Sequence, residues 1–397
     1  MAGSSISAFT EFVNETGPTY LTSQTDRVND AAKTNYETIG YLSRGQQMSD
    51  VLQGGANIKD IIYLNAVRRA RSYKPMEDQS YQAVQTGVTW TGEWRCWMTD
   101  IVVTDQELEL NAGATLNTAT RAQKFKDIWY TKQQQAHSDA MDYLEEKYWA
   151  VPDTTQMESA TGQEMYSIPA LINEFSNGLP TSVHPGGAWT TKMGINPTTA
   201  GQTNWVPQQF DYIDKLPSTS GSYNAKSLIA VFDKAWSKLN FRPPPHDKQY
   251  FDTETAQPIN VVFTSLQGRL NLLTTYRASN NLWADVHDPF FTPMYGGAPV
   301  VYVAMLDTAA IFPTGAGATL STELDTAGTT NAGPRYFLIQ PKYLRTIFHS
   351  ERFMANLGKM KDVRQPTTNI WPIDTWSNTI ARSLRRHAII YPSADIS

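Results

Sequence analysis

The residues best suited to metal chemistry stand close together in the segment ADVHDP at 284–289. Asp285, His287 and Asp288 place two carboxylates and an imidazole within four positions, and divalent metals accept such ligands. The other histidines are scattered along the sequence, so no second cluster obviously completes a coordination shell. The alternative interpretation is a loop with a turn-forming Asp-Pro pair. We favour the loop over a metal-dependent enzyme.

Two further segments resemble catalytic or nucleotide sites only in part. PTGAGATL at 313–320 is glycine-rich, but it lacks the Gly-Lys-Ser/Thr ending that places a lysine against phosphates. Cys96, the single cysteine, stands between Arg95 and Trp97 in a predicted strand, where a buried or interface thiol is commoner than a nucleophile. No Gly-x-Ser-x-Gly motif is present. We therefore expect no catalytic residue, no cofactor and no bound metal.

Length, charge and composition narrow the class of protein. A chain of 397 residues exceeds what one hydrophobic core usually serves, so we expect at least two sub-domains. The net charge of −5 argues against a dedicated nucleic-acid-binding protein. A single cysteine excludes an internal disulfide and fits a reducing compartment. The N-terminus lacks a signal-peptide pattern and no apolar run approaches about 18 residues, so we expect a soluble cytosolic chain without a membrane span.

Three tryptophans lie within eight positions of VTWTGEWRCWMTD, residues 88–100. Alternation on both sides of Thr91-Gly92 predicts two strands joined by a three-residue loop, Thr91 to Glu93, with Trp90 beside Trp94. A hairpin alone is too small to bury Trp90, Trp94 and Trp97. Either the rest of the chain or another chain must cover them.

The strongest helix signal covers residues 118–150, which contain neither glycine nor proline. Ala136, Ala140, Leu144 and Tyr148 repeat at a spacing of four, and Pro152 fixes the end. Such a helix is roughly 45 Å long. We interpret it as a structural strut.

The remaining segments divide into compact and extended parts. Residues 225–312 alternate helix and strand, which predicts a compact α/β sub-domain, and strands follow within 334–349 and 380–392. Residues 1–55 form a polar arm, and 151–225 form a loop-rich excursion. Neither buries enough apolar surface to order itself, so a second copy of the chain is the expected cover for both.

Basic residues gather in two places. Arg68, Arg69, Arg71 and Lys74 form one run. Residues 341–387 hold nine Lys or Arg against three Asp or Glu, a local charge of +6 that leaves −11 elsewhere. Contact with DNA and charge-complementary contact between copies both fit this division. We favour contact between copies because the chain as a whole is acidic.

In their order along the chain, these features resemble the major capsid proteins of tailed bacteriophages, which have the Hong Kong 97-like fold. YWAVPD at the end of the predicted helix and TTKMGINPTT in the excursion carry part of this resemblance. It implies an α+β fold with five parts: an N-terminal arm at 1–55, an extended hairpin loop and its base at 56–117, a peripheral domain at 118–224 with a spine helix at 118–150, an axial domain at 225–335, and a return to the peripheral domain at 336–397.

The resemblance also implies a function. Such a chain is a non-enzymatic structural protein that assembles into hexamers and pentamers of an icosahedral shell around packaged double-stranded phage DNA, with only weak, non-specific DNA contact. Implied partners are other copies, a portal protein at one vertex, a scaffolding protein and, in some members, a decoration or cement protein. The implied location is the virion capsid, assembled in the host cytoplasm. An encapsulin-type compartment is the alternative within the same fold. The expected subunit-interface residues are Arg68, Arg69, Arg71, Lys74, Trp90, Trp94 and Trp97.

Overall fold

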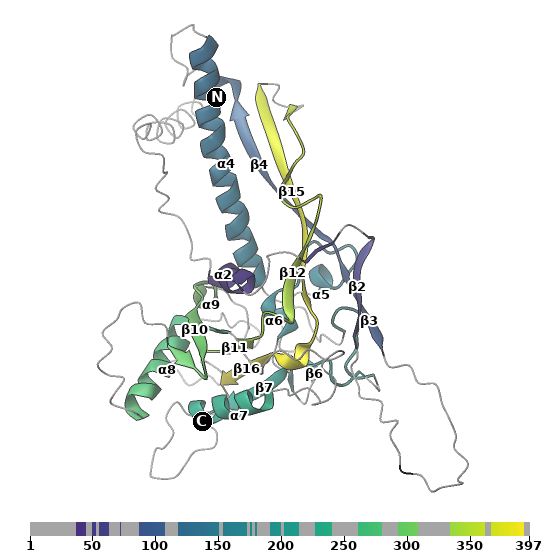
Figure 1. The fold of residues 1–397 in the computed structure, drawn as a ribbon, viewed down its shortest axis with the longest axis vertical. Coiled ribbons are helices and arrows are strands. Elements are labelled where there is room, and N and C mark those ends of the chain that lie inside the picture. Colours follow the sequence, from purple (N-terminus) through teal and green to yellow (C-terminus); the bar gives the residue numbers. More distant parts are fainter. Residues whose placement is uncertain are drawn as a thin grey trace, which may run out of the picture. The chain divides into compact units, whose positions relative to one another are not determined.

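The computed structural model has a mixed α+β fold (Figure 1). It describes residues 37–44, 50–52, 55–62, 72, 87–107, 118–150, 154–172, 175–176, 179–180, 191–199, 202–213, 227–239, 261–279, 293–308, 334–361 and 367–392.

The chain divides into two compact units. The first unit comprises Met1–Thr34, Trp97–Tyr143 and Met354–Thr375. The second unit comprises Asn35–Cys96, Leu144–Phe353 and Trp376–Ser397. Several elements, including the longest helix and the longest strand, contribute residues to both units.

A six-stranded mixed sheet forms the centre of the second unit, in the order β7-β16-β11-β8-β10-β9. Parallel pairing joins β16 to β7 and β10 to β8, whereas β11 pairs antiparallel with both β16 and β8. The strands are β7 (Gln208–Tyr212), β8 (Val261–Thr264), β9 (Met294–Tyr295), β10 (Ala298–Tyr302), β11 (Tyr336–Ile339) and β16 (Ala388–Pro392).

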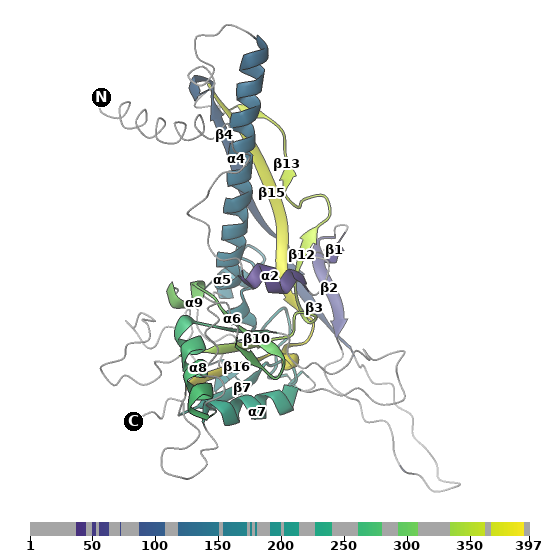
Figure 2. The same cartoon turned by 60° about the vertical axis from the view of Figure 1, so that its left-hand side comes forward.

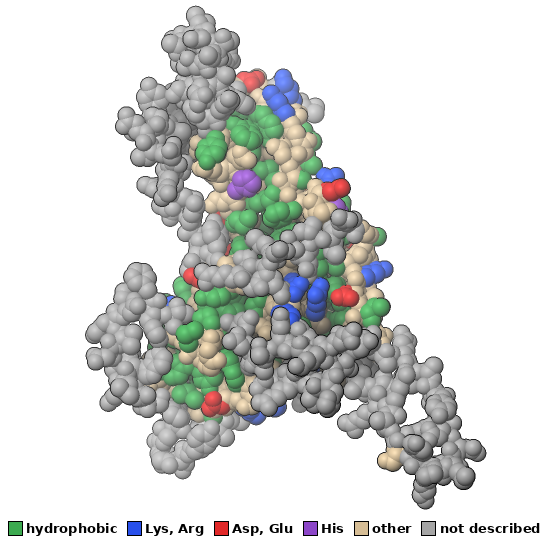
Figure 3. Space-filling model, in the orientation of Figure 1, with side chains coloured by type: hydrophobic (Ala, Val, Ile, Leu, Met, Phe, Trp, Pro, Cys, Tyr) green, Lys and Arg blue, Asp and Glu red, His purple; other side chains and the backbone are tan. Residues whose placement is uncertain are grey.

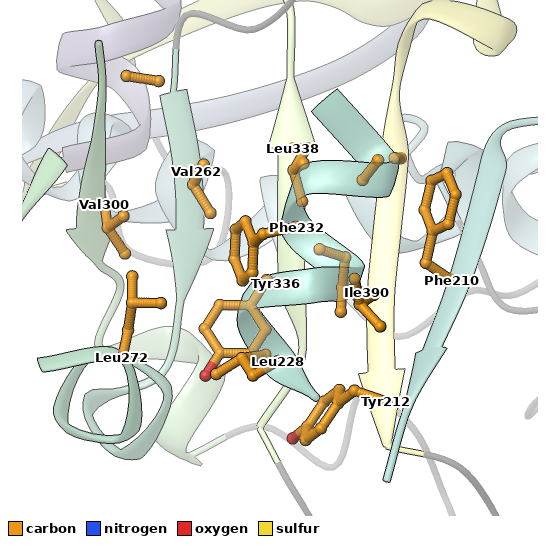
Figure 4. Packing of buried hydrophobic residues seen from close by; sticks show 14 of the residues in the cluster. Phe210, Tyr212, Leu228, Phe232, Val262, Leu272, Val300, Tyr336, Leu338 and Ile390 are labelled. Carbon is orange, nitrogen blue, oxygen red and sulfur yellow. The ribbon is translucent and has the colours of Figure 1, made fainter. Parts of the chain in front are cut away.

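One face of this sheet packs against α7 (Leu228–Leu239) and α8 (Leu266–Ser279). Alternate strand residues such as Val262, Tyr336 and Ile390 point to these helices, and Phe232 of α7 inserts among them (Figure 4). Every residue of VVFT in β8 and of YFLI in β11 is buried. Continuous apolar runs of this kind indicate strands that are covered on both faces.

The opposite face of the sheet is covered by α2 (Glu37–Arg44) and by Trp149, which follows the longest helix. The views in Figures 1 and 2 agree that α2 lies across the sheet from α7 and α8. The ring of Trp149 makes edge contacts with Phe263 and Phe337, at centroid distances of 5.7 and 5.3 Å. Strand residues such as Phe263 and Phe337, which alternate with those that face α7, thus form a second apolar layer on this face.

Buried Glu145 holds α2 in place. Its two carboxylate oxygens accept hydrogen bonds from the backbone N–H groups of Thr38 and Ile39, each at 3.0 Å. A carboxylate at a helix N-terminus satisfies N–H groups that the helix leaves unpaired. Burial raises the pKa of Glu145, and these hydrogen bonds oppose that shift. Part of the expected arm, residues 37–44, therefore packs on its own chain rather than on another copy.

A second sheet has the order β1-β12-β15-β13, with β14 and β4 also paired to β15. In the second unit, β12 pairs antiparallel with the C-terminal part of β15. In the first unit, β13 and β14 pair with the N-terminal part of β15. The strands are β1 (Asp50–Leu52), β4 (Arg95–Thr104), β12 (Leu344–His349), β13 (Ala355–Asn356), β14 (Met360–Lys361) and β15 (Thr368–Ala381).

The longest helix, α4, runs from Thr118 to Tyr148, two residues short of the predicted end. Its four stripe residues Ala136, Ala140, Leu144 and Tyr148 are all buried. In the first unit, Ala136 packs with Ile101 and Val103 of β4 and Ile373 of β15, with Trp129 and Trp371 at the margin.

The remaining elements are short. Two-stranded pairings join β2 (Asn57–Ile62) to β3 (Val88–Glu93) and β5 (Phe175–Ser176) to β6 (Leu179–Pro180). The short helices are α5 (Thr154–Met157), α6 (Ile168–Leu171), α9 (Met305–Thr308) and the 3-10 turn η2 (Leu384–Arg386).

The prediction of a hairpin turn at Thr91–Glu93 is wrong. Thr91 and Gly92 lie inside β3, which pairs with β2 and is followed almost directly by β4. The strands β11 and β16 pair into the same sheet as β8. In each case the partner is distant in sequence, and local alternation does not specify such a partner.

His387 lies fully buried beside β11, and its Nδ1 accepts a hydrogen bond from the backbone N–H of Gln340 at 3.2 Å. Burial lowers its pKa to about 3, a hydrogen bond with the Tyr343 backbone opposes this, and the charge of Arg386 reinforces it. The unfolded chain takes up the same proton near pH 6.5. Acidification between these values therefore favours unfolding.

We expect wild-type protein to lose more stability than His387→Gln as the pH falls from 7 to 4. The added loss approaches about 1.4 kcal/mol per pH unit, because only the unfolded wild-type chain gains a proton at position 387. Urea unfolding at several pH values measures the difference, with His137→Gln as the control for loss of a histidine. If the free energy of unfolding changes with pH equally in wild type and His387→Gln, the lowered pKa of His387 is contradicted.

Candidate functional site

The tryptophan-rich segment 88–100 divides its three rings between different environments. Trp90 in β3 is only 1% exposed, and its ring lies 3.6 Å from the Cβ position that Gly92 lacks. Trp94 and Trp97 are both half-buried. Trp90 therefore fills the core of its own chain, and we remove it from the surface expected to contact a neighbour.

Arg95 follows Trp94 and points its guanidinium into the second unit, where it is 2% exposed. Nη2 donates to the carbonyl oxygens of Met157 and Ser159, at 2.6 and 2.9 Å, and Nη1 donates to the carbonyl of Gly162. A planar guanidinium carries several donors in a fixed geometry, which suits three converging carbonyls. Arg95 therefore fastens β4 to the segment that contains α5.

Desolvation lowers the pKa of Arg95, while Tyr166, Glu93 and Glu158 act in the opposite direction. The guanidinium nevertheless stays charged, because its ordinary pKa lies far above neutrality. These hydrogen bonds from Nη1 and Nη2 go to backbone carbonyls rather than to a carboxylate. The role of this charge is therefore structural, and it positions the adjacent Trp94.

Trp94 begins a row of rings on the second unit. Its centroid lies 5.4 Å from that of His349, which lies 5.4 Å from that of Trp376, and both contacts are edge-to-face. The guanidinium of Arg352 lies 5.6 Å from the Trp376 ring. The indole N–H of Trp94 donates to the carbonyl of Gly55 at 3.0 Å. We call Trp94, His349, Trp376 and Arg352, all half-buried, the aromatic row.

The ribbon formed by β2 and β3 lies next to the start of this row. Its β3 strand is attached to the rest of the second unit through the Thr91 N–H, which donates to the Met193 carbonyl at 3.1 Å. Ile61 of β2 is 63% exposed. A two-stranded ribbon is marginal by itself, and Ile61 adds one exposed apolar side chain to its surface.

The outer face of β4 is also apolar in part. Cys96, Met98 and Asp100 are exposed, and Met98 is 65% exposed, whereas Ile101 and Val103 point inward. Cys96 is exposed on its own chain, so of the two expected roles for its thiol, buried or at an interface, the first is wrong and the second stays a prediction. In the first unit, Trp97 packs against Tyr143 of α4 at a centroid distance of 5.4 Å.

Part of the expected excursion packs on its own chain. Met193 and Ile195 are fully buried and Trp205 is 1% exposed. The Lys192 Nζ donates to the Leu171 carbonyl at 3.0 Å, and the Trp205 indole donates to the Lys192 carbonyl at 3.0 Å. Burial lowers the pKa of Lys192 well below its usual value, although Glu158 opposes the shift. The described parts of this segment, 191–199 and 202–207, thus need no second copy to cover these side chains.

Several expected site residues lie outside the part of the chain that the structure describes. These are the basic run Arg68, Arg69, Arg71 and Lys74, and the candidate metal ligands Asp285, His287 and Asp288. Among the described residues, no group of three or more His, Cys, Asp or Glu side chains is placed to hold a metal ion. Within the same residues, no helix is long and apolar enough to cross a membrane.

Sequence reasoning missed the buried polar residues that organise this region, Arg95, Glu145 and Lys192. Arg95 gave one signal, because a cation inside an apolar alternating strand is unusual and must find hydrogen-bond acceptors. Glu145 stands one position after the buried stripe residue Leu144, which places it at the edge of the apolar face of α4. Their partners are backbone groups, which residue types do not reveal.

We expect Arg95→Lys to lower the free energy of unfolding by about 2 kcal/mol, because one ammonium group cannot reach all three carbonyls and leaves at least one unsatisfied. Cys96→Ser, one residue further along the same strand and exposed, is the matched control and should have little effect. Urea unfolding of both variants measures the difference. Equal stability of Arg95→Lys and wild type would show that the three hydrogen bonds from Arg95 to backbone carbonyls contribute nothing to the free energy of unfolding.

Comparison with known proteins places this architecture among capsid structures. No protein-family model and no curated protein sequence matches the chain. The capsid asymmetric unit of cyanophage A-1(L) matches with a TM-score of 0.51 at 10% identity, over 95% of this chain and 99% of that chain. The capsid of a native GTA particle matches with a TM-score of 0.50 at 10% identity, over 93% and 94% respectively. The chain therefore has the fold of a phage-type capsid protein.

Proposed function

We propose that the chain is a major capsid protein of a tailed bacteriophage and that its function is self-assembly into a closed shell. The observation that carries the proposal is the similarity to a cyanophage capsid chain along nearly the full length of both chains. A similarity of this extent concerns the whole architecture rather than one shared module. Fold alone does not determine function, so the surfaces of the chain provide the second line of support.

Several exposed apolar side chains suit surfaces that neighbouring subunits would cover. Ile61 on the ribbon, Met98 on β4 and Tyr130 on α4 are each more than half exposed. Three of the described buried ionisable groups, Arg95, Glu145 and Lys192, bind backbone atoms, which is a structural role. We infer a structural, non-enzymatic protein.

The finer parts of the proposal concern the assembly. We infer hexamers and pentamers in an icosahedral shell that encloses packaged double-stranded DNA, formed in the host cytoplasm and retained in the virion. A portal protein at one vertex and a scaffolding protein are the proposed partners, with a decoration or cement protein as a further one. Contact with DNA is weak and non-specific, in keeping with the net charge of −5.

Electron microscopy after size-exclusion chromatography tests the proposal directly. The chain is expressed alone and together with the products of neighbouring genes, and we expect closed particles or hexameric rings. DNA inside the particles supports the phage capsid, whereas an enclosed enzyme identifies an encapsulin-type compartment instead. A monomer or dimer under both conditions would contradict shell formation.

Variants of Trp94 and Trp90 test the proposed assembly at single residues. We expect Trp94→Ala to leave the subunit folded and to reduce the yield of closed particles, because Trp94 begins the half-buried aromatic row. Trp90→Ala should instead destabilise the subunit itself by about 3–5 kcal/mol, because it empties a core position. Urea unfolding and particle yield, measured on both variants, separate the two effects. Normal particle yield from Trp94→Ala would remove it from the interface.

A further inference from the structure

The ribbon of β2 and β3 in the second unit has one buried face and one outward face. Ile58 of β2 and Trp90 of β3 lie on the same face of the ribbon, and both are buried. Because side chains alternate along a strand, Lys59 and Ile61 point the other way. Lys59 is exposed and Ile61 is 63% exposed. The outward face of the ribbon therefore presents a cation and an apolar side chain two residues apart.

The sheet strands of the first unit also have a face that turns away from α4. Ile101 of β4 and Ile373 of β15 pack with Ala136 of α4, which defines the inner face of these strands. Alternation therefore turns Met98 and Asp100 of β4 outward. Both are exposed, Met98 to 65%. Figure 3 shows that hydrophobic as well as charged side chains reach the surface of this unit.

Two further strands of the first unit extend this outward face with apolar side chains. Ile370 stands three residues before Ile373 in β15, so it points away from α4, and Met360 of β14 is its cross-strand partner. Leu357 follows Asn356, the partner of Ile373, and therefore also points outward. Met360 is 49% exposed and Leu357 is 41% exposed. We call Met98, Asp100, Leu357, Met360 and Ile370 the outer sheet face.

The ribbon and the outer sheet face match in spacing and in charge. Lys59 and Ile61 are two residues apart on one strand, and so are Asp100 and Met98, which is about 7 Å in each case. In one orientation, Ile61 can thus lie over Met98 while Lys59 lies over Asp100. Within the part of the chain that the structure describes, the side chains of Lys59 and Asp100 form no ion pair.

We propose that the outward face of the β2–β3 ribbon docks on the outer sheet face of a second copy of the chain. Because two different surfaces meet, the contact is heterologous, and its repetition closes a ring when the rotation between copies is suitable. The apolar contact supplies most of the affinity, and the Lys59–Asp100 pair selects the orientation. This inference rests on the proposed function and adds to it the two surfaces that recognise each other.

A second copy is the occupant that these observations favour. Every copy carries both surfaces, so each ribbon and each outer sheet face in an assembly finds a partner of matching charge. The carboxylate of Asp100 opposes a polyanion such as DNA on the same face. Both surfaces are also built on strands, and sheet faces pack about 10 Å apart with interdigitating side chains. A two-stranded ribbon, which is marginal alone, gains stability from such cover.

Charge reversal on either surface tests the contact. Lys59→Asp brings two aspartates together, and Asp100→Lys brings two lysines together. We expect both variants to remain folded, as measured by thermal unfolding, and to form particles or rings at roughly a tenth of the wild-type level or less. Lys234→Asp changes an exposed lysine of α7 by the same charge and is the control that should assemble normally. Equal loss in this control, or no loss in the two reversed variants, would overturn the proposal.

Mixing the two reversed variants makes the test specific for contact between copies. We expect the mixture to recover particles or rings, because every contact in an alternating ring then joins a lysine to an aspartate. The double variant Lys59→Asp/Asp100→Lys should recover them as well. Recovery in the double variant but not in the mixture would place the pair within one chain and overturn the proposal.

Disulfide cross-linking in solution tests the contact without requiring closed particles. Ile61→Cys in one preparation and Met98→Cys in another, both with Cys96→Ser, are mixed and mildly oxidised. We expect at least roughly tenfold more covalent dimer than from Lys234→Cys mixed with Met98→Cys, because effective concentration favours groups that a contact holds together. Assembly of wild type without this excess would overturn the inference alone. The cross-link without any assembly of wild type would instead contradict the proposed shell.

Discussion

Burial of both faces of the six-stranded sheet is the constraint on which the second unit depends. Because α7 and α8 cover only one face, a second layer must cover the other, and α2 with Trp149 supplies it. The Glu145 carboxylate secures that layer by accepting the first N–H groups of α2. A buried carboxylate without such donors would cost several kcal/mol. The apolar layer and the polar anchor therefore stabilise each other.

The same solution appears at Arg95, where a buried cation is satisfied by three carbonyl oxygens of the segment at 157–162. The side chain of Glu145 binds backbone donors and that of Arg95 binds backbone acceptors, so each buried side chain fixes a loop or a short helix. These interactions are local in space and distant in sequence. Such hydrogen bonds hold segments with little regular structure in place. Residues 157–162, for example, are fastened to β4 through Arg95.

How much of this could be predicted from the sequence depends on the range of the interaction. The long helix of residues 118–150 and the alternation of helix and strand in residues 225–312 follow from patterns within a few residues, and the structure has α4 and β8 there. Thr91-Gly92 has the composition of a turn, yet pairing with β2 and close packing at Gly92 keep it extended. The placement of β11 and β16 beside β8 also depends on long-range pairing. Of the expected interface tryptophans, Trp90 shows why residue type alone misleads, because core and interface positions favour the same large rings.

The position of β16 has a consequence for the order of events during synthesis. This strand, Ala388–Pro392, is inserted between β7 and β11, although it is the last strand that the structure describes. Until it emerges from the ribosome, β7 has no partner in the sheet and β11 has an open edge. A nascent chain therefore cannot complete this sheet before residues 388–392 have left the ribosome. Translation of β16 thus sets the earliest time at which the proposed contacts between copies could form.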